Sequence, residues 1–300
     1  MKAEHPETRS IRAGYISGLL AAALFGSVFT VAKTILNSVD PLVLSAMVYT
    51  ISGIALIPFA KASFRLGSRR DYAQILVVTG LGAIAGPVLL LYGLRLTSSA
   101  DASILSNGEM VFTLILSALF FGERPKGKLG LLGVTIVIAG LFIATTDFTS
   151  VKSSILHFNL GNILILSAML MWGIDNNVSR RLTLSKDATP AKIAMIKSLL
   201  GGVALLAISL LVGKASAFAS IDFSNWFTIV AMSVSGFGGA LLLFLNAMKR
   251  IGTVKTMTAF SMTPVFGLII ADIVGSELIT PIQVLATAMI IIGIFFASRR

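Results

Sequence analysis

The sequence predicts an all-α integral membrane protein with ten transmembrane helices in two inverted five-helix repeats and both termini in the cytoplasm. Hydrophobic residues make up 56% of the 300 positions and charged residues only 12%, about half the charged fraction of a soluble domain. Ten apolar runs have the length of about 20 residues that a helix needs to cross the hydrocarbon core. Basic residues gather at alternate breaks between these runs. A transmembrane β-barrel would show alternating segments of about ten residues instead.

The apolar runs follow one another from near the N-terminus to the C-terminus. Polar breaks such as Asp40-Pro41 and Arg69-Arg70-Asp71 separate them, and these residue types start and end helices. The first run follows the polar residues 1–12 and is too long for the apolar part of a cleavable signal peptide. We therefore expect spans at residues 13–36, 41–60, 72–95, 98–121, 127–145, 159–183, 189–213, 223–248, 252–274 and 280–298.

Positive charge predicts the orientation of these spans, because cytoplasmic loops collect Lys and Arg. With both termini in the cytoplasm, all but six of the 24 basic residues fall on the cytoplasmic side. The exceptions are Arg95, Lys152 and Lys214 on the outer side and Lys33, Lys197 and Lys255 within spans. The formal net charge of +11 thus reflects topology rather than nucleic-acid binding. We expect a multi-pass protein of the cell membrane.

An internal repeat divides the chain into two halves of five helices each. Val-Phe-Thr-Leu-Ile at 111–115 matches Val-Phe-Gly-Leu-Ile at 265–269, and Glu123 and Glu277 lie at the same distance after these motifs. Five is odd, so the second half is inverted relative to the first, as in transporters whose substrate site lies near the midplane between the halves. The expected parts are a cytoplasmic tail at 1–12, a first half at 13–146, an extracytoplasmic linker at 147–158 and a second half at 159–300.

Several short motifs recur in the two halves. They are Phe25-Gly26 and Trp172-Gly173, Pro264-Val265-Phe266, Phe121-Gly122-Glu123 and Gly275-Ser276-Glu277. In order and spacing, from about residue 13 to 298, they resemble the EamA-type branch of the drug/metabolite transporter superfamily. The resemblance implies a ten-helix carrier with a central cavity, often an exporter of amino acids or other metabolites. The sequence departs from the family pattern at Met110, where proline is usual, and at Val48-Tyr49, where a basic residue is usual.

Polar residues deep in a membrane are costly, so each is a candidate site residue. Glu109 lies near the middle of the fourth predicted span. A lone carboxyl there should be neutral or paired with a cation, because burial disfavours the charged form. It could exchange a proton or meet a cationic solute, or it could be a structural group bonded to a neighbouring helix. Asn107, Tyr92 and Asn246 are further polar candidates for the substrate or proton site.

A second group of candidates lies in the sixth and seventh spans. Asp175 and Asn176 follow Trp172 near the middle of the sixth, and Lys197 lies about two turns into the seventh. Lys197 could neutralise Asp175, receive a substrate carboxylate or extend toward the cytoplasm. Asp175 could instead bond another helix. Trp172 is a candidate wall for a partly apolar solute.

Prolines and glycines predict where helices bend. Pro87 and Pro264 fall near the middle of the third and ninth spans, and Gly238 and Gly239 near the middle of the eighth. Proline frees a backbone carbonyl and kinks a helix, whereas glycine permits close packing. We expect these residues at helix kinks and gates.

Together these features favour a secondary transporter, an exporter of small amphiphilic solutes such as amino acids, rather than an enzyme. A facilitative channel stays open as an alternative, and so does a lipid-modifying enzyme, although its usual clusters of carboxylates or histidines are missing. The sequence has no Walker A motif and no cysteine, and its two histidines are isolated, so we expect neither ATP hydrolysis nor a metal or cofactor. We expect the partners to be the lipid bilayer and a small solute, without nucleic acid, and the chain to act as a monomer.

Overall fold

The computed structural model describes residues 6–61, 64–121, 127–145, 159–185 and 187–298. Every regular element in these ranges is a helix. The helices of the first half are α1 (Pro6–Ile35), α2 (Pro41–Leu56), α3 (Arg69–Val78), the π-helix η1 (Thr79–Ala85), α4 (Gly86–Leu96), α5 (Ser99–Leu105), α6 (Gly108–Phe121) and α7 (Gly127–Thr145). The predicted linker 147–158, the first five residues of the predicted tail and Glu123 lie outside the described residues.

The second half contains a similar series of helices. They are α8 (Leu160–Thr183), α9 (Pro190–Leu211), the short α10 (Ala215–Ala219), α11 (Phe223–Ala231), the π-helix η2 (Met232–Gly239), α12 (Ala240–Phe260), α13 (Thr263–Ile273) and α14 (Pro281–Ser298). Gly252 interrupts α12 with φ 79°, a conformation that suits glycine. This interruption coincides with the polar break predicted between the eighth and ninth spans.

Long apolar helices confirm the prediction of an all-helical membrane protein. Within the described ranges, five helical stretches are long and apolar enough to cross a membrane, namely Ser10–Ile35, Arg69–Leu96, Ser99–Leu119, Pro190–Leu211 and Phe223–Phe260. Shorter apolar helices cover Pro41–Leu56, Lys128–Ala144, Thr263–Ile273 and Pro281–Phe296. The third, fourth, eighth and ninth predicted spans are each built from more than one helical element.

Helix starts follow the local chemistry that the sequence predicts. Asp40 caps α2, where its carboxylate accepts a hydrogen bond from Leu42 N at 3.0 Å, and Pro41 follows it. Thr189 caps α9 in the same way and is followed by Pro190. Proline is favoured at the first position of a helix because it has no N–H to leave unpaired there. α2 and α9, which lie at equivalent places in the two halves, thus both begin with a capping side chain followed by proline.

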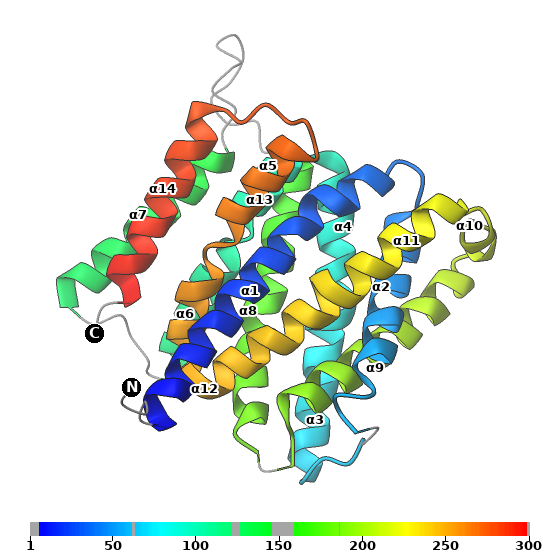
Figure 1. The fold of residues 1–300 in the computed structure, drawn as a ribbon, viewed down its shortest axis with the longest axis horizontal. Coiled ribbons are helices and arrows are strands. Elements are labelled where there is room, and N and C mark those ends of the chain that lie inside the picture. Colours follow the sequence, from blue (N-terminus) through cyan, green and yellow to red (C-terminus); the bar gives the residue numbers. More distant parts are fainter. Residues whose placement is uncertain (1–5, 62–63, 122–126, 146–158, 186, 299–300) are drawn as a thin grey trace, which may run out of the picture.

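Helices of the two halves interleave in matched pairs (Figure 1). The first helix of each half packs on helices of the other half: α1 packs on α12 and α13, and α8 packs on α4 and α6. α2 and α9 pack directly on each other, and so do α7 and α14, which lie together at one edge of the bundle. A Cβ on Gly26 of α1 would contact Phe266, and a Cβ on Gly173 of α8 would contact Phe112. The central helices α1, α2, α8, α9 and α12 therefore surround the middle of the bundle.

Candidate functional site

A buried cavity of about 70 Å³ lies in the middle of the bundle. Its walls come from α1, α2, α6, α8, α9, η2 and α12, so both halves of the chain contribute to it. The lining residues are Phe25, Tyr49, Glu109, Trp172, Asp175, Asn176, Lys197, Ser198, Phe237, Ala240, Leu241, Phe244 and Phe260. Charged and polar side chains line the cavity together with aromatic rings.

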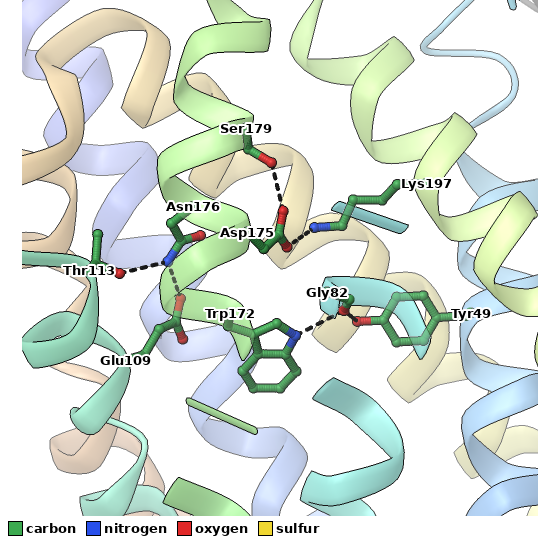
Figure 2. Close-up of polar contacts among 9 residues, drawn as sticks. All are labelled: Tyr49, Gly82, Glu109, Thr113, Trp172, Asp175, Asn176, Ser179 and Lys197. Carbon is green, nitrogen blue, oxygen red and sulfur yellow. Dashed lines mark hydrogen bonds and ion pairs between the residues drawn. The ribbon is translucent and has the colours of Figure 1, made fainter. Parts of the chain in front are cut away.

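An ion pair between Lys197 of α9 and Asp175 of α8 forms part of the cavity lining (Figure 2). Both side chains are almost fully buried, and Ser179 donates a further hydrogen bond of 2.8 Å to the other oxygen of Asp175. A buried charge is tolerated when it is paired and hydrogen-bonded. Of the arrangements that the sequence left open for Lys197, the structure has the pairing with Asp175.

Glu109 of α6 lies across from this pair and is 6% exposed. Asn176 donates a hydrogen bond of 2.6 Å to Glu109 Oε1, and the same amide nitrogen lies 3.2 Å from Thr113 Oγ1 (Figure 2). Among the described residues, Lys197 is the one buried cation, and it already forms an ion pair with Asp175. Glu109 therefore has no ion-pair partner of its own among the described residues, which favours the approach of a cationic group.

The helix that carries Glu109 differs from the single span that the sequence predicts. Turn residues Ser106 and Asn107 separate α5 from α6. Glu109 N donates to Ser106 O at 3.1 Å, a bond over three residues that tightens the helix. Glu109 consequently lies in the first turn of α6 rather than in the middle of a continuous helix, and an acid near a helix N-terminus is favoured electrostatically.

The second half of the chain has a break at the equivalent place. Ser261 and Met262 separate α12 from α13, and Pro264 lies in the first turn of α13. The amide of Asn107 donates a hydrogen bond of 3.3 Å to Ser261 O, which joins the two breaks directly. Asn107 is buried beside the cavity and is not among the residues that line it.

The backbone carbonyl of Gly82 in η1 lies beside the cavity and accepts two side-chain hydrogen bonds. Tyr49 Oη and Trp172 Nε1 each donate to it at 2.9 Å (Figure 2). In the π-helical register, Gly86 N donates to Leu81 O, five residues earlier. The next donor in that register would be residue 87, which is proline and has no N–H. Pro87 therefore leaves the Gly82 carbonyl available to the two aromatic side chains.

Aromatic rings form a further part of the cavity wall. Phe25 of α1 contacts Trp172, Phe237 and Phe260 with ring centroids 5.5–6.0 Å apart. Phe244 packs on Phe260 with centroids 4.9 Å apart. Edge-to-face and tilted arrangements of this kind stabilise aromatic clusters. The rings give the cavity an apolar wall in addition to its charged groups.

Two of the predicted polar candidates lie away from this cavity. Tyr92 of α4 lies 3.4 Å from Lys214 Nζ and packs near Leu42 and Leu205. Asn246 donates a hydrogen bond of 3.0 Å to Leu242 O in its own helix. Gly238 and Gly239 lie at the end of η2, next to the cavity residues Phe237 and Ala240.

Sequence reasoning missed several residues of the site. Tyr49 and Ser198 line the cavity, Ser179 donates a hydrogen bond to Asp175, and Thr113 accepts one from Asn176. Hydroxyl residues are common in apolar helices, so the sequence carries no signal for Ser198, Thr113 or Ser179. Spacing could have indicated Ser179, because it lies three and four residues after Asn176 and Asp175 and so shares a helix face with them and with Trp172.

A buried cavity with both polar and aromatic walls, enclosed by apolar helices from both halves of a chain, is typical of a membrane transporter. Comparison with known proteins agrees with this class. The sequence profile of the EamA-like transporter family matches residues 12–146 and again residues 159–299. The chain belongs to this family, as its motifs predicted.

Relatives of known sequence carry transporter names. An "Uncharacterized transporter" of Methanothermobacter thermautotrophicus is 28% identical over 299 residues, which cover 94% of this chain and 85% of the relative. The "Probable amino-acid metabolite efflux pump" of Escherichia coli is 23% identical over 290 residues, which cover 93% of each protein. A solved crystal structure that is 18% identical superposes with a TM-score of 0.70 over 96% of this chain and 95% of the other, which shows a shared fold.

Proposed function

We propose that this protein is a secondary transporter that exports small amphiphilic solutes, such as amino acids, across the cell membrane. The central cavity is the observation that carries the proposal, because it presents a cation, two acids and an aromatic wall within one buried space. The name of the Escherichia coli relative, an amino-acid metabolite efflux pump, supports this class of solute. We propose that the activity is transport and not enzymatic.

The cavity chemistry suits a zwitterion with an apolar part. Lys197 provides a cation for a solute carboxylate, and an ammonium group has three donors, so it can hold Asp175 and the solute together. Asn176 bonds Oε1 of Glu109, which leaves Oε2 for a solute ammonium group or a proton. The rings of Phe25 and Phe244 would contact the apolar part. A polyanion would need several more cations than this cavity offers.

Two inverted halves, with ten spans and both termini in the cytoplasm, are part of the proposal. The double match of the family profile, at residues 12–146 and 159–299, supports two equivalent units. So do the matched features of the two halves, which are a π-helix at Thr79–Ala85 and at Met232–Gly239 and a helix break before α6 and before α13. Because one chain provides every wall of the cavity, we propose that a monomer suffices.

Alternating access requires the cavity to change in size. Its volume of about 70 Å³ is well below the volume of most ligand sites, which is about 300–1,000 Å³. We propose that the solute enters when helices bend at the two π-helices and at the two helix breaks. Pro87, Pro264, Gly238 and Gly239 lie in or directly beside these elements and would act as hinges.

The first test is flux of labelled amino acids and small amphiphiles into proteoliposomes that contain the purified protein. The proposal predicts saturable flux that a solute on the opposite side accelerates. Leu241→Trp, which places an indole in the cavity lining, should abolish this flux. Leu243→Trp is the matched control, because Leu243 lies on the same helix and does not line the cavity. Flux that rises linearly with concentration would indicate a channel, and equal loss in both variants would remove the assignment of the cavity.

A further inference from the structure

Two cations make the same type of contact in the two halves of the chain. Lys33 lies in the last turn of α1, and its ammonium group donates hydrogen bonds to the carbonyls of Leu94 at 2.8 Å and Thr97 at 2.6 Å. Arg180 lies in the last turn of α8, and its guanidinium group donates a hydrogen bond of 2.9 Å to the carbonyl of Met248. Each cation thus binds the carbonyl end of another helical segment, where the helix dipole favours positive charge.

The two contacts lie at opposite ends of α8. The start of α8 adjoins the Lys33 contact, because Asn162 accepts a hydrogen bond of 2.8 Å from the hydroxyl of Thr97, whose carbonyl Lys33 also binds. Arg180 lies eighteen residues further along the same helix, which is about 27 Å at helical rise. Trp172, which lines the cavity, lies on the stretch of α8 between them. The cavity therefore lies between the two contacts.

In each half, the bound carbonyl belongs to the segment that follows a π-helix. Leu94 lies nine residues after the last residue of η1, and Met248 lies nine residues after the last residue of η2. The two cations correspond as well, because Lys33 and Arg180 lie equally far beyond the aromatic–glycine motif of their own helix. In two inverted halves, equivalent contacts of this kind lie at opposite membrane surfaces.

We propose that Lys33 and Arg180 are the two gate residues of the transporter, with Lys33 holding the outer side closed and Arg180 the cytoplasmic side. This inference rests on the proposed function, namely on the inverted halves and on bending at the π-helices. Bending at η1 moves α4 away from α1 only when the bonds of Lys33 break. Bending at η2 moves the first part of α12 away from α8 only when the bond of Arg180 breaks. The structure has both contacts formed, which agrees with the small volume of the cavity.

The chemistry of these contacts suits a bond that opens and closes. Lys33 and Arg180 are partly buried, and the acceptors that they bind are neutral backbone carbonyls. When such a contact opens, water can take the place of the carbonyl, and no second charge is left unpaired. The buried pair of Lys197 and Asp175 differs in this respect, because its separation would leave two unsolvated charges.

Labelling of a single cysteine from each side of the membrane tests the proposal. The chain contains no cysteine, so Ser198→Cys places one thiol in the cavity lining, at a residue that is 1% exposed. A membrane-impermeant quaternary-ammonium methanethiosulfonate is added to right-side-out or inverted membrane vesicles, and mass spectrometry gives the rate of modification. Lys33→Met should raise the rate from the outer side about tenfold and not raise the rate from the cytoplasmic side, because loss of a charge-assisted hydrogen bond shifts an equilibrium by about that factor. Arg180→Met should raise the rate from the cytoplasmic side alone.

Two exposed cations next to the bound carbonyls provide matched controls. Arg95 follows Leu94 and Lys249 follows Met248, and both side chains are exposed. Neither side chain forms a hydrogen bond or ion pair with the part of the chain that the structure describes. Arg95→Met and Lys249→Met remove the same charge at the same two surfaces, so each should leave the rates within about twofold of the wild type.

The side from which labelling increases separates an open gate from a destabilised fold, because a loosened bundle would admit the reagent from both sides. If the methionine variants do not reach the membrane, Lys33→Gln and Arg180→Gln take their place. Glutamine keeps an amide group with two donors, so these variants should show the same one-sided increase to a smaller extent.

Three outcomes would overturn the proposal. Wild-type labelling rates in both gate variants would show that the two cations only cap helices. Equal increases from both sides would show a general loosening of the bundle, and increases of the same size in the two controls would show an effect of surface charge. The labelling needs no solute, so a failure to transport any tested solute would count against the proposed function and not against the gates.

Discussion

Replacing Asp175 by Asn removes the partner of Lys197 and leaves a cation whose side chain is only 4% exposed. Breaking a buried ion pair in this way costs about 3–5 kcal/mol, because the remaining charge is neither solvated nor paired. Lys197→Met leaves Asp175 with the hydroxyl of Ser179 as a neutral partner, and we expect a similar loss. The double variant Asp175→Asn/Lys197→Met has no unpaired charge, so it should recover most of the lost stability.

The assay is the free energy of unfolding in mixed micelles as the denaturing detergent is increased, for the wild type, both single variants and the double variant. A double-mutant cycle over these four proteins gives the coupling energy of the pair. Lys192→Met is the matched control: Lys192 lies on the same helix and bonds backbone carbonyls at the surface, so its loss should cost less than about 1 kcal/mol. Single losses below about 1 kcal/mol, or a double variant as unstable as the two losses added together, would refute the reasoning.

Three further variants test local contacts by the same unfolding assay. Gly82→Ala would place a methyl group against the ion-paired carboxylate of Asp175 and should lower the free energy of unfolding by about 1–3 kcal/mol. Gly80→Ala is the control in the same π-helix, because its methyl group would meet nothing within 4 Å, and it should cost far less stability. Equal losses of stability in the two variants would contradict the contact at Gly82. The two carboxylate oxygens of Glu277 accept hydrogen bonds of 2.9 and 3.0 Å from the first N–H groups of α5. Glu277→Gln removes one of these acceptors and should lower the free energy of unfolding by about 1 kcal/mol. An unchanged stability would exclude this cap. Lys214→Gln removes a partly exposed ion pair with Asp40 and should lower the free energy of unfolding by less than about 1 kcal/mol. The effect should be smaller in high salt, because salt screens exposed charges. A larger loss that does not depend on salt would contradict this prediction.

The length of the apolar runs and the polar residues between them predicted most of the helical organisation. The break between α5 and α6 was missed, although Ser106-Asn107-Gly108 is a turn signal, because a long apolar run outweighed it. Neither π-helix could be predicted, since the choice between hydrogen bonds over four and five residues depends on packing and on side chains from other helices. Tyr49 and Trp172 provide such contacts to η1.

The sequence identified the buried charges of the site more readily than their partners. Depth in an apolar run was sufficient to select Glu109, Asp175 and Lys197, because few residues at that depth are ionisable. Their hydrogen bonds to Asn176 and Ser179 depend on which helix faces meet. The same limit explains why Tyr92 and Asn246 were chosen as candidates: their depth could be estimated, but the direction of their side chains could not.

The position of Lys33 near the end of α1 was predicted, and its role follows from the structure. Its ammonium group donates hydrogen bonds to Leu94 O at 2.8 Å and Thr97 O at 2.6 Å, at the end of α4. Arg180 of α8 bonds Met248 O of α12 at 2.9 Å in the corresponding place of the second half. A cation near the C-terminus of a helix is favoured by the helix dipole. The sequence alone does not show such contacts between a side-chain cation and the carbonyls of another helix, because they depend on how the helices pack.

Of the two roles open to Glu109 in transport, we propose proton exchange, because Glu109 is the buried acid without an ion-pair partner in the described part of the chain. The most direct measurement is solute flux in proteoliposomes with and without a pH gradient, for the wild type and Glu109→Gln. The account predicts gradient-driven accumulation in the wild type, and in Glu109→Gln solute exchange without accumulation. Saturable flux in both proteins that ignores the gradient would contradict it and leave Glu109 a structural role.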